Sequence, residues 1–526
     1  MGPPGGSTPQ GNTSLAERFS ALGAGDIADD DSIADVRAPL LDSYADEERA
    51  KGTGAEDESG GLHRRLTFVD GISVVVGIIV GSGIFASPGV VLQSTGSVGL
   101  SLLAWLGGGT LAMLSALIYA ELGSSIPHAG GDSHYLRIGF SNVVSFMYTW
   151  TSFFVLNGGG LSIVSVTFAQ YMGSQIFDDY SSNAYDWRVK GLSLACIVVL
   201  TLTNCFGVQM GSWVQNVLSG SKLVLVLLLA GAAVVYLHDE PAVAARNMAH
   251  PFRDSQPAGF GPGMVAALWA FDGWSAVTML GEELKNPGRD MPRSIVFGML
   301  TVIVIYVTAN VAYLCILPVH TVKFGAVVAV DAVERALGTW AGSLTAILVA
   351  LSTLGSANAT IMCGGRYLYA ASRAGQIPSW MSALGQKSRA PYAALLAQGA
   401  WACLLLLCSS ASLSSLINYF GVASWVFYGL SALSLVRIRA RFPSIHRPFK
   451  LRAHWAFSYS VFGLACYLVL TSLMRNAGPA SAALGFALLS IPVYKLTQWF
   501  RGGIPHIESV KHLRCDSVSN FVERSG

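Results

Sequence analysis

Residues 71–89 read GISVVVGIIVGSGIFASPG, a stretch apolar enough to lie in a membrane. Three glycines, Gly77, Gly81 and Gly83, interrupt it, and Pro88 follows. A helix interior loses about 1 kcal/mol of stability for each glycine relative to alanine, so glycines this close together favour a helix that opens midway. Close packing of neighbouring helices through small residues is the alternative interpretation.

An opened helix inside a membrane has a specific chemical use. Backbone N–H and C=O groups need partners in hydrocarbon, so a break is tolerated only where it faces protein or a water-filled cavity. The break offers free N–H groups and a positive dipole end to an anion, and free carbonyls to a cation. A zwitterion such as an amino acid needs both kinds of group.

The composition of the chain points to a membrane protein. Of its 526 residues, 52% are hydrophobic and only 12% are charged, whereas a soluble domain carries roughly 25% charged residues. The net charge of +2 is nearly balanced and predicts no nucleic-acid partner. The 8 cysteines show no metal-ligand spacing, and no nucleophile–base pair sits together in any run, so we expect neither a cofactor nor an enzyme.

Apolar runs of roughly 20 residues follow one another from Leu66 onward, each long enough to cross a hydrocarbon core of about 30 Å. The sequence therefore predicts an all-α membrane protein with twelve transmembrane helices, spanning 68–92, 98–123, 142–173, 191–208, 213–237, 262–282, 294–317, 339–370, 391–409, 413–436, 455–474 and 479–500.

Basic residues predict the orientation of these spans. They concentrate before span 1 and in alternate loops, most densely in residues 437–452, which places those loops and both termini in the cytoplasm. We expect three parts: a disordered cytoplasmic N-terminal tail over residues 1–62, a transporter domain over 63–500 and a cytoplasmic C-terminal tail over 501–526.

A second interrupted span lies in the middle of the chain. Residues 268–274 read LWAFDGW, an apolar run broken by Asp272 and Gly273. Spans 1 and 6 occupy corresponding positions in two five-span halves, and because five is odd the halves must be inverted relative to each other. Paired interruptions of this kind indicate the binding site of a transporter.

Four stretches resemble a known family in their order and spacing. The chain resembles the amino acid–polyamine–organocation superfamily and, within it, the L-type (light-chain) amino acid transporters. The resemblance covers roughly residues 66–500 and is carried by GIIVGSGIFASP (77–88), YAELGSSIPHAGGDSHY (119–135), LWAFDGWSAVTMLGEELKNPGRDMP (268–292) and GSANATIMCGGRYLYAASRAGQIP (355–378).

The resemblance implies a LeuT-like inverted repeat, with spans 1–5 and 6–10 as the core and spans 1 and 6 broken. It also implies that the substrate carboxylate meets the N–H groups of Gly81, Ser82 and Gly83. The substrate ammonium is then expected at backbone carbonyls around Ile79, Trp269 and Asp272.

Side chains near the second break are given roles by the same resemblance. Trp269 aligns with a bulky aromatic residue that closes over substrate, whereas Trp274 is expected to pack. Relatives that accept dibasic substrates and cystine can carry an aspartate at the place of Asp272, which could pair with a cationic side chain. The alternative is that Asp272, beside Gly273, only caps the broken helix.

Three further residues are expected to act around the site. A lysine matching Lys222 occupies, in relatives, the place of a coupling sodium ion, although simple snorkelling to the interface is the alternative. Glu121 is expected to pair with cytoplasmic loop groups during gating. Asn358 is expected to face span 1, where it lines the site or bonds to backbone.

Two stretches depart from the family pattern. The loop between spans 3 and 4, FDDYSSNAYDWRVKG (177–191), lacks the cysteine through which light-chain members bind a glycoprotein heavy chain, so we expect no disulfide-linked partner. Residues 157–160, Asn-Gly-Gly-Gly, stand where relatives commonly have a proline-containing segment, and glycines there allow bending or close approach.

The sequence thus predicts a secondary L-amino acid transporter that works by alternating access, with sodium-independent exchange as the first choice of mode. Neutral amino acids are the expected substrates, and transport of cationic ones is left open. A polyamine carrier, and an amino-acid sensor with little transport, are the alternatives. We expect the plasma membrane as its location, with an endolysosomal or vacuolar membrane as the alternative.

Overall fold

The computed structural model describes residues 67–126, 130–177, 186–206, 208–275, 278, 284–325, 327–385, 390–408, 413–475 and 477–502. The chain divides into two units, residues 1–59 and 60–526, and all the described residues belong to the second unit. The predicted N-terminal tail and nearly all of the predicted C-terminal tail lie outside these residues, so the division into domains stays a prediction.

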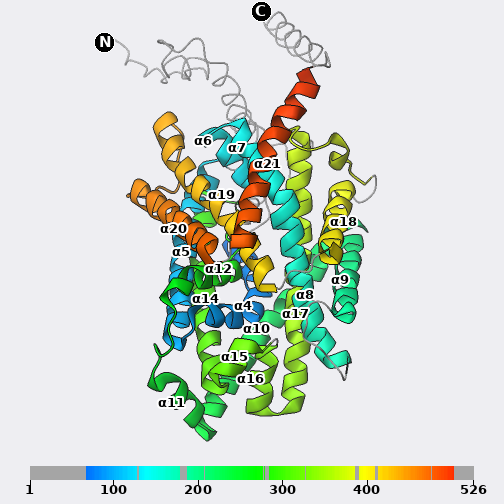
Figure 1. Cartoon of the computed structure of the whole chain (residues 1–526). Coiled ribbons are helices and arrows are strands. Elements are labelled where there is room, and N and C mark those ends of the chain that lie inside the picture. The colour runs from blue at the N-terminus through cyan, green and yellow to red at the C-terminus, as the bar shows by residue number, and fades with distance from the viewer. Residues whose placement is uncertain are drawn as a thin grey trace, which may run out of the picture. The chain divides into compact units, whose positions relative to one another are not determined.

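The described part of the chain is built from helices (Figure 1), which confirms the all-α fold class. Its first half contains α3 (Phe68–Ile79), α4 (Gly83–Thr95), α5 (Val98–Ser125), α6 (Gly131–Gly139), α7 (Asn142–Thr151), η1 (Ser152–Asn157), α8 (Gly158–Ile176), α9 (Trp187–Phe206), α10 (Val208–Asp239) and α11 (Ala242–Ala249). The second half contains η2 (Pro257–Gly259), α12 (Phe260–Ala270), α14 (Pro287–Ile316), α15 (Val319–Phe324), α16 (Val328–Leu337), α17 (Thr339–Arg373), η3 (Ser379–Ser382), α18 (Tyr392–Cys408), α19 (Leu413–Arg441), α20 (His454–Arg475) and α21 (Ala477–Gly502).

Many of these helices are long and apolar enough to cross a membrane. Among the described residues 8 helices meet that condition, or up to 10 if each of two bent pairs counts as one span, and α18 is a shorter apolar helix. Each of the twelve predicted spans overlaps at least one helix, but the number twelve itself stays a prediction.

Span 1 is broken, as the glycine pattern predicts. Helix α3 ends at Ile79, α4 begins at Gly83, and the two are bent by 48°. Helix α12 ends at Ala270, and Gly273 follows with a φ of 125°, a left-handed conformation that favours glycine. Both interruptions therefore lie where the sequence places them.

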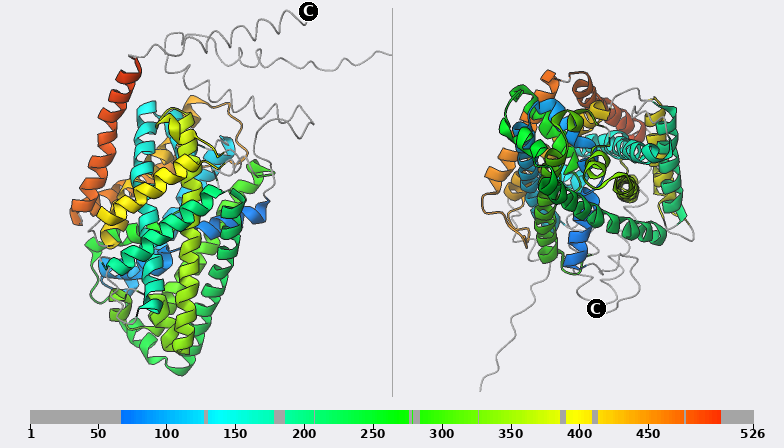
Figure 2. Two further views of the ribbon diagram at one scale, coloured as in Figure 1. Left: turned by 90° about the vertical axis from the view of Figure 1, so that its right-hand side faces the viewer. Right: turned by 90° about the horizontal axis from the view of Figure 1, so that it is seen from below.

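Corresponding helices of the two halves contact each other. The contacts join α4 with α12, α5 with α14, α8 with α17 and α9 with α18, which are spans 1 and 6, 2 and 7, 3 and 8, and 4 and 9 of the predicted repeat. Contacts between equivalent elements are what a two-fold pseudo-axis through the bundle produces, so this packing supports the inverted repeat. Helices α20 and α21 lie at the edge of the bundle (Figure 2).

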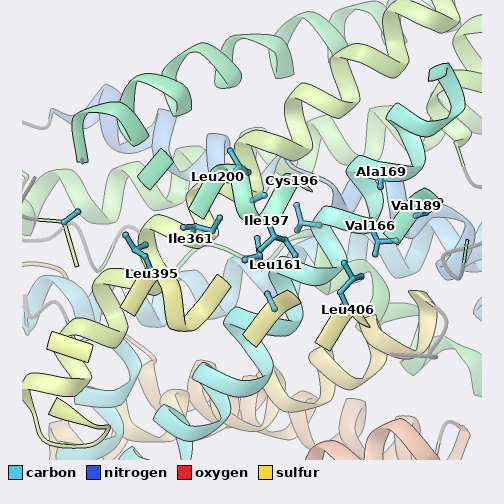
Figure 3. Packing of buried hydrophobic residues seen from close by; sticks show 14 residues of the cluster. Leu161, Val166, Ala169, Val189, Cys196, Ile197, Leu200, Ile361, Leu395 and Leu406 are labelled. Carbon is cyan, nitrogen blue, oxygen red and sulfur yellow. The ribbon is translucent and has the colours of Figure 1, made fainter. Parts of the chain in front are cut away.

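A buried apolar cluster holds α8, α9, α17 and α18 together. Figure 3 shows Leu161 of α8 beside Ile197 of α9, with Ile361 of α17 and Leu406 of α18 close by, and all four are at most 4% exposed. Lipid is as apolar as these side chains, so their interdigitation stabilises the bundle through van der Waals packing rather than through removal from water.

Candidate functional site

A cavity of about 200 Å³ lies between the two broken helices, and we call it the central cavity. Its lining includes seven of the eight residues predicted to bind substrate: Ile79, Gly81, Ser82, Gly83, Trp269, Asp272 and Gly273. Segments far apart in the sequence thus contribute to one space, and η1, α8, α17 and α19 close its sides.

The break in span 1 presents backbone donors to this cavity. Helix α4 starts at Gly83, and the first N–H groups of a helix have no partner within it. The amide of Val80 is bonded to the carbonyl of Val76 at 2.9 Å, and that of Phe85 to the carbonyl of Ser82 at 3.1 Å, so the donors left for a ligand lie between these two residues. The arrangement, together with the positive end of the helix dipole, suits a carboxylate.

Close packing explains why these donors belong to glycines. A Cβ atom on Gly83 would lie 2.4 Å from the Cα of Ala270, and one on Gly81 would lie 2.1 Å from the Oγ of Ser356. The break in span 1 is therefore pressed against α12 and α17. The two interpretations of the glycine stretch, open backbone and close helix packing, both hold.

The break in span 6 presents an acidic side chain. Asp272 follows the end of α12, and its Oδ1 accepts hydrogen bonds from the Gly273 amide at 3.0 Å and from the Tyr428 hydroxyl at 2.5 Å. Asp272 thus caps its own loop and also lines the central cavity. One of its oxygens is engaged by the protein, so the capping role does not exclude contact with a ligand.

Tyr306 of α14 lies between the two breaks, and no pattern in the sequence predicted this position. Its hydroxyl lies 2.6 Å from the carbonyl oxygen of Ile79 and 3.0 Å from that of Ala270, at the ends of α3 and α12. A tyrosine hydroxyl has one proton and can donate to only one of these acceptors at a time. A polar ring within an apolar helix was the only signal in the sequence.

The two tryptophans of residues 268–274 behave differently. Trp269 lines the central cavity and is 8% exposed, and its role as a gate stays a prediction. Trp274 is fully buried and packs against Trp425 and Tyr428, with ring centroids 6.2 and 5.0 Å apart. The packing role expected for Trp274 matches this position.

Lys222 reaches from α10 to the end of α3. Its ammonium donates to the carbonyl of Gly77 and lies 3.4 Å from the Oγ of Ser356, and the residue is 3% exposed. The side chain is directed into the protein, so it does not snorkel to the interface. It lies behind the break rather than in the lining of the central cavity.

Asn358 lies elsewhere than the sequence suggests. Its Oδ1 accepts a hydrogen bond from the Nδ2 of Asn204 on α9 at 2.7 Å, and it is fully buried. The lining of the central cavity passes from Ser356 to Ala359 and Thr360 without it. On a helix, residues two positions apart point in nearly opposite directions, so Asn358 faces α9 while Ser356 faces the break.

The departure at residues 157–160 also belongs to the site. Residues 152–157 form the π-helical turn η1, and Asn157 bonds to the carbonyl and the hydroxyl of Ser152, both at 3.0 Å. Ser152, Asn157 and Gly160 line the central cavity. π-Helical turns are rare and are frequent at functional sites, which the glycine triplet alone did not reveal.

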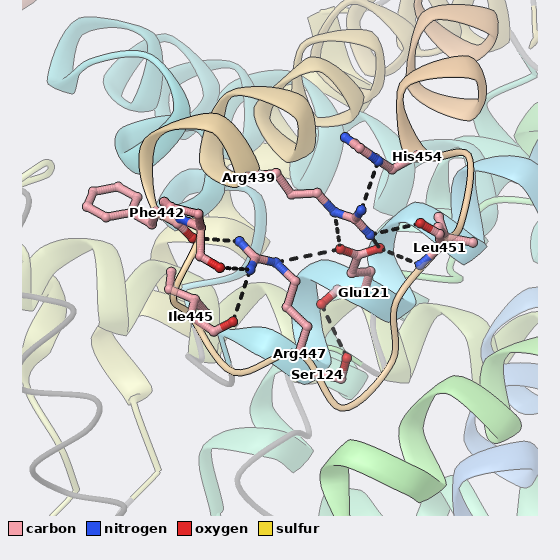
Figure 4. Close-up of polar contacts among 9 residues, drawn as sticks. Glu121, Ser124, Arg439, Phe442, Ile445, Arg447, Leu451 and His454 are labelled. Carbon is pink, nitrogen blue, oxygen red and sulfur yellow. Dashed lines mark hydrogen bonds and ion pairs between the residues drawn. The ribbon is translucent and has the colours of Figure 1, made fainter. Parts of the chain in front are cut away.

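Glu121 lies apart from the central cavity, in an ion-pair cluster (Figure 4). Its carboxylate accepts from Arg439 at 2.7 and 2.5 Å and from the amide of Leu451 at 2.9 Å, and Arg447 lies 3.8 Å away. Glu121 itself is fully buried. The cluster ties α5 to the end of α19 and to the segment that follows α19. Within the described ranges no group of His, Cys, Asp and Glu side chains could hold a metal ion.

Comparison with known proteins shows the family to which the chain belongs. Residues 66–492 match the amino acid permease family. The chain is 34% identical over 394 residues to the b(0,+)-type amino acid transporter 1 of Mus musculus, covering 74% of this chain and 79% of that protein. It is 31% identical over 467 residues to the large neutral amino acids transporter small subunit 2 of Oryctolagus cuniculus, covering 86% and 85%.

A third relative is the human cystine/glutamate transporter, 30% identical over 449 residues, which cover 84% of this chain and 88% of that protein. The fold, with its two opposed breaks, is that of a multi-pass membrane transporter. The chain transports amino acids and is not an enzyme. The chain belongs to the amino acid permease family, among relatives of the light-chain type.

Proposed function

We propose that this transporter exchanges neutral and cationic L-amino acids across the plasma membrane by alternating access, without sodium. The observation that carries the proposal is Asp272, an acidic side chain in the lining of the central cavity and beside the carbonyl end of α12. The names of the relatives range from neutral amino acids to cystine and glutamate, so the side-chain preference must be argued from this chain's own site.

In this proposal the substrate backbone binds between the two breaks. The carboxylate accepts hydrogen bonds from the N–H groups of Gly81, Ser82 and Gly83, and the ammonium donates to the carbonyls around Ile79 and Trp269. The N–H end of one helix thus binds the negative group and the carbonyl ends bind the positive group, so the substrate needs no buried counter-ion. Asp272 then remains available for the side chain of the substrate.

Sodium independence is inferred from Lys222. Its ammonium already donates to the Gly77 carbonyl, at the place where a coupling cation would neutralise the carbonyl end of α3. A fixed positive charge there removes the need for a soluble one. The cation is covalently part of the protein, so it cannot be coupled to a sodium gradient.

Gating is assigned to two separate places. Trp269 closes over the substrate, and Glu121 holds the end of α19 through Arg439 and the segment after α19 through Arg447. Both termini are placed in the cytoplasm by the basic loops, with Arg439 and Arg447 among the residues that carry this argument. Residues 177–191 contain no cysteine, so we propose a carrier without a disulfide-linked partner.

The test is uptake of labelled leucine and labelled arginine into proteoliposomes loaded with unlabelled amino acid, in sodium-free buffer. The wild-type chain is compared with Asp272→Asn, which keeps the shape and removes the charge. We expect arginine exchange to fall at least tenfold and leucine exchange to change less than threefold, because an unpaired cation beside an amide loses a charge-assisted hydrogen bond, roughly 1.5–3 kcal/mol.

Loss of both activities in Asp272→Asn would assign the residue to the loop structure instead, and retention of both would contradict its role as a selector. A polyamine carrier is the second candidate that Asp272 supports. Polyamines have no carboxylate, so they should compete with arginine poorly, whereas agmatine competing as well as arginine would favour the polyamine function.

A further inference from the structure

A second cavity, which we call the outer cavity, has a volume of about 280 Å³ and a mostly polar lining. It lies where the end of α4, the start of α12, the start of α19 and the junction of α20 and α21 meet. Figure 1 shows α12 and α20 next to each other, and the two helices are in contact.

The outer cavity offers one positive charge. Arg475, at the end of α20, is the only charged residue among the described residues that line it. Gln93 and Gln256 add amides, and Ser94 adds a hydroxyl. Arginine is a preferred partner for carboxylates because its planar fork can donate two parallel hydrogen bonds.

The outer cavity also contains an unsatisfied acceptor. Asn418 of α19 lines it and is only 7% exposed, yet its Oδ1 has no hydrogen-bond partner among the described residues. A buried polar atom without a partner costs roughly 1–3 kcal/mol, which indicates that something else completes the bond. A donor in the outer cavity, such as an ammonium group, would do so.

The outer cavity adjoins the central cavity along two helices. Val265 and Ala266 of α12 line the outer cavity, while Trp269 and Ala270, four residues further on, line the central one. On α19, Ile417 and Asn418 line the outer cavity and Phe420 lines the central one. The residues that line the two spaces are therefore at most about one helical turn, about 5.4 Å, apart along these helices. Trp269 and Phe420 are the central-cavity residues nearest to the outer cavity along α12 and α19.

We propose that the outer cavity is a docking site for a free amino acid on its way to the central cavity. The guanidinium of Arg475 binds the carboxylate, the Oδ1 of Asn418 accepts from the ammonium, and the side chain remains in the wider part of the space. The inference rests on the proposed function, since the ligand is the carrier's own substrate. Release past Trp269 and Phe420 then delivers the amino acid to the glycine break.

The test measures how exchange depends on the concentration of leucine outside proteoliposomes that hold the carrier in one orientation. Three variants are compared with the wild-type chain: Arg475→Met, Arg475→Lys and the control Arg246→Met, an exposed arginine on α11 that lines neither cavity. We expect Arg475→Met to raise the KM for external leucine roughly two- to fivefold with kcat unchanged, as loss of one partly exposed charge pair would do.

Arg475→Lys should restore most of the affinity, and Arg246→Met should behave like the wild type. In Asn418→Leu the KM should rise as well, with the same kcat. Inorganic phosphate, added outside as a carboxylate-free anion, should not inhibit wild-type exchange at concentrations near the KM for leucine.

An unchanged KM in Arg475→Met overturns the proposal, as does an equal loss of kcat in the methionine and lysine variants, which would mark Arg475 as structural. Strong inhibition by phosphate that disappears in Arg475→Met also overturns it, because the outer cavity would then be an anion site. Failure of the wild-type chain to exchange any amino acid would instead refute the proposed function, so the two failures are distinguishable.

Discussion

Single residues set the geometry of the central cavity, and Gly83 shows how. It supplies the first N–H of α4 and also leaves the space that the backbone of Ala270 fills. The obstacle to a larger residue is backbone, which cannot rotate away as a side chain could. The position therefore requires glycine for contact and not for its dihedral angles.

Replacement of Gly83 by alanine should abolish amino acid exchange, by at least a hundredfold, because the added methyl must push the two broken helices apart. Leucine exchange in proteoliposomes measures this. Gly159→Ala is the matched control, since a Cβ there meets nothing within 4 Å, and it should retain wild-type exchange. Equal activity of the two variants would contradict the tight contact between the breaks.

Lys222 gives a second prediction at the level of the residue. Lys222→Met removes the charge but keeps the length, and it leaves the Gly77 carbonyl without its donor. We expect leucine exchange to fall roughly five- to 150-fold, because a buried acceptor that loses a charged partner costs roughly 1–3 kcal/mol. Exchange is measured with and without sodium. Full activity without sodium in Lys222→Met would refute the assigned role.

Residues of the site could be predicted from the sequence where they interrupt a pattern. Gly81, Gly83 and Asp272 stand out because glycine and a charged group are costly within a span. Tyr306 and Tyr428 could not be predicted, because a tyrosine within an apolar helix has no periodic or energetic signature. Their roles come from which helices the fold brings beside the two breaks.

Among the elements, the segment after α19 is held by a single acidic residue. Glu121 receives two arginines and one backbone amide from residues 439–451, and Figure 4 shows them converging on its two oxygens. A buried carboxylate needs this many partners to balance the loss of water. Removal of the Glu121 charge should therefore destabilise the fold by leaving the two arginines without their carboxylate partner.

Glu121→Gln should lower the midpoint of thermal unfolding by several degrees and slow exchange at the same time. Breaking one side of a buried ion pair costs roughly 3–5 kcal/mol. Asp254→Asn, at an exposed turn, is a suitable control for loss of one negative charge. A variant with wild-type exchange and reduced stability would show that the cluster is structural and takes no part in gating.

Helix α16, outside the spans, gives a prediction about pH. Burial, with a smaller effect of Glu334, raises the pKa of Asp331 to about 6 from its ordinary value of 3.8. A raised acid pKa means that the folded state binds the proton more tightly, so Asp331 lowers stability above about pH 6 and this cost disappears as the pH falls towards 4.

Asp331→Asn should therefore raise the midpoint of thermal unfolding at pH 7.5, on the order of 1–3 °C, and have little effect near pH 4. Unfolding of the detergent-solubilised protein at both values measures the difference. A variant that is less stable than the wild type at pH 7.5 would contradict the assigned cause.

The positions of the long helices were predictable because each apolar run contains at least one of them. The π-helical turn η1 was not predictable. Its hydrogen bonds span one residue more than those of an α-helix, and the local sequence SFFVLN carries no signal for that difference. Helices α6 and α16 were not predicted for another reason: they are short, and the prediction used the length of apolar runs.

For the molecule as a whole, the inverted repeat followed from counting spans between two interruptions. The contacts between corresponding helices support it. The outer cavity could not be predicted, since it arises where α20 and α21, which lie outside the repeats, meet α4, α12 and α19.

The single proton of Tyr306 has a consequence for the return of an unloaded carrier. With two carbonyl acceptors and one donor, one acceptor stays unmatched unless the substrate ammonium or a trapped water fills the deficit. An occluded state without cargo bears that deficit, roughly 1–3 kcal/mol, while a loaded one does not. Since each 1.4 kcal/mol is tenfold in a rate or an equilibrium, we expect the empty carrier to cross more slowly than the loaded one, which would couple inward transport to outward transport.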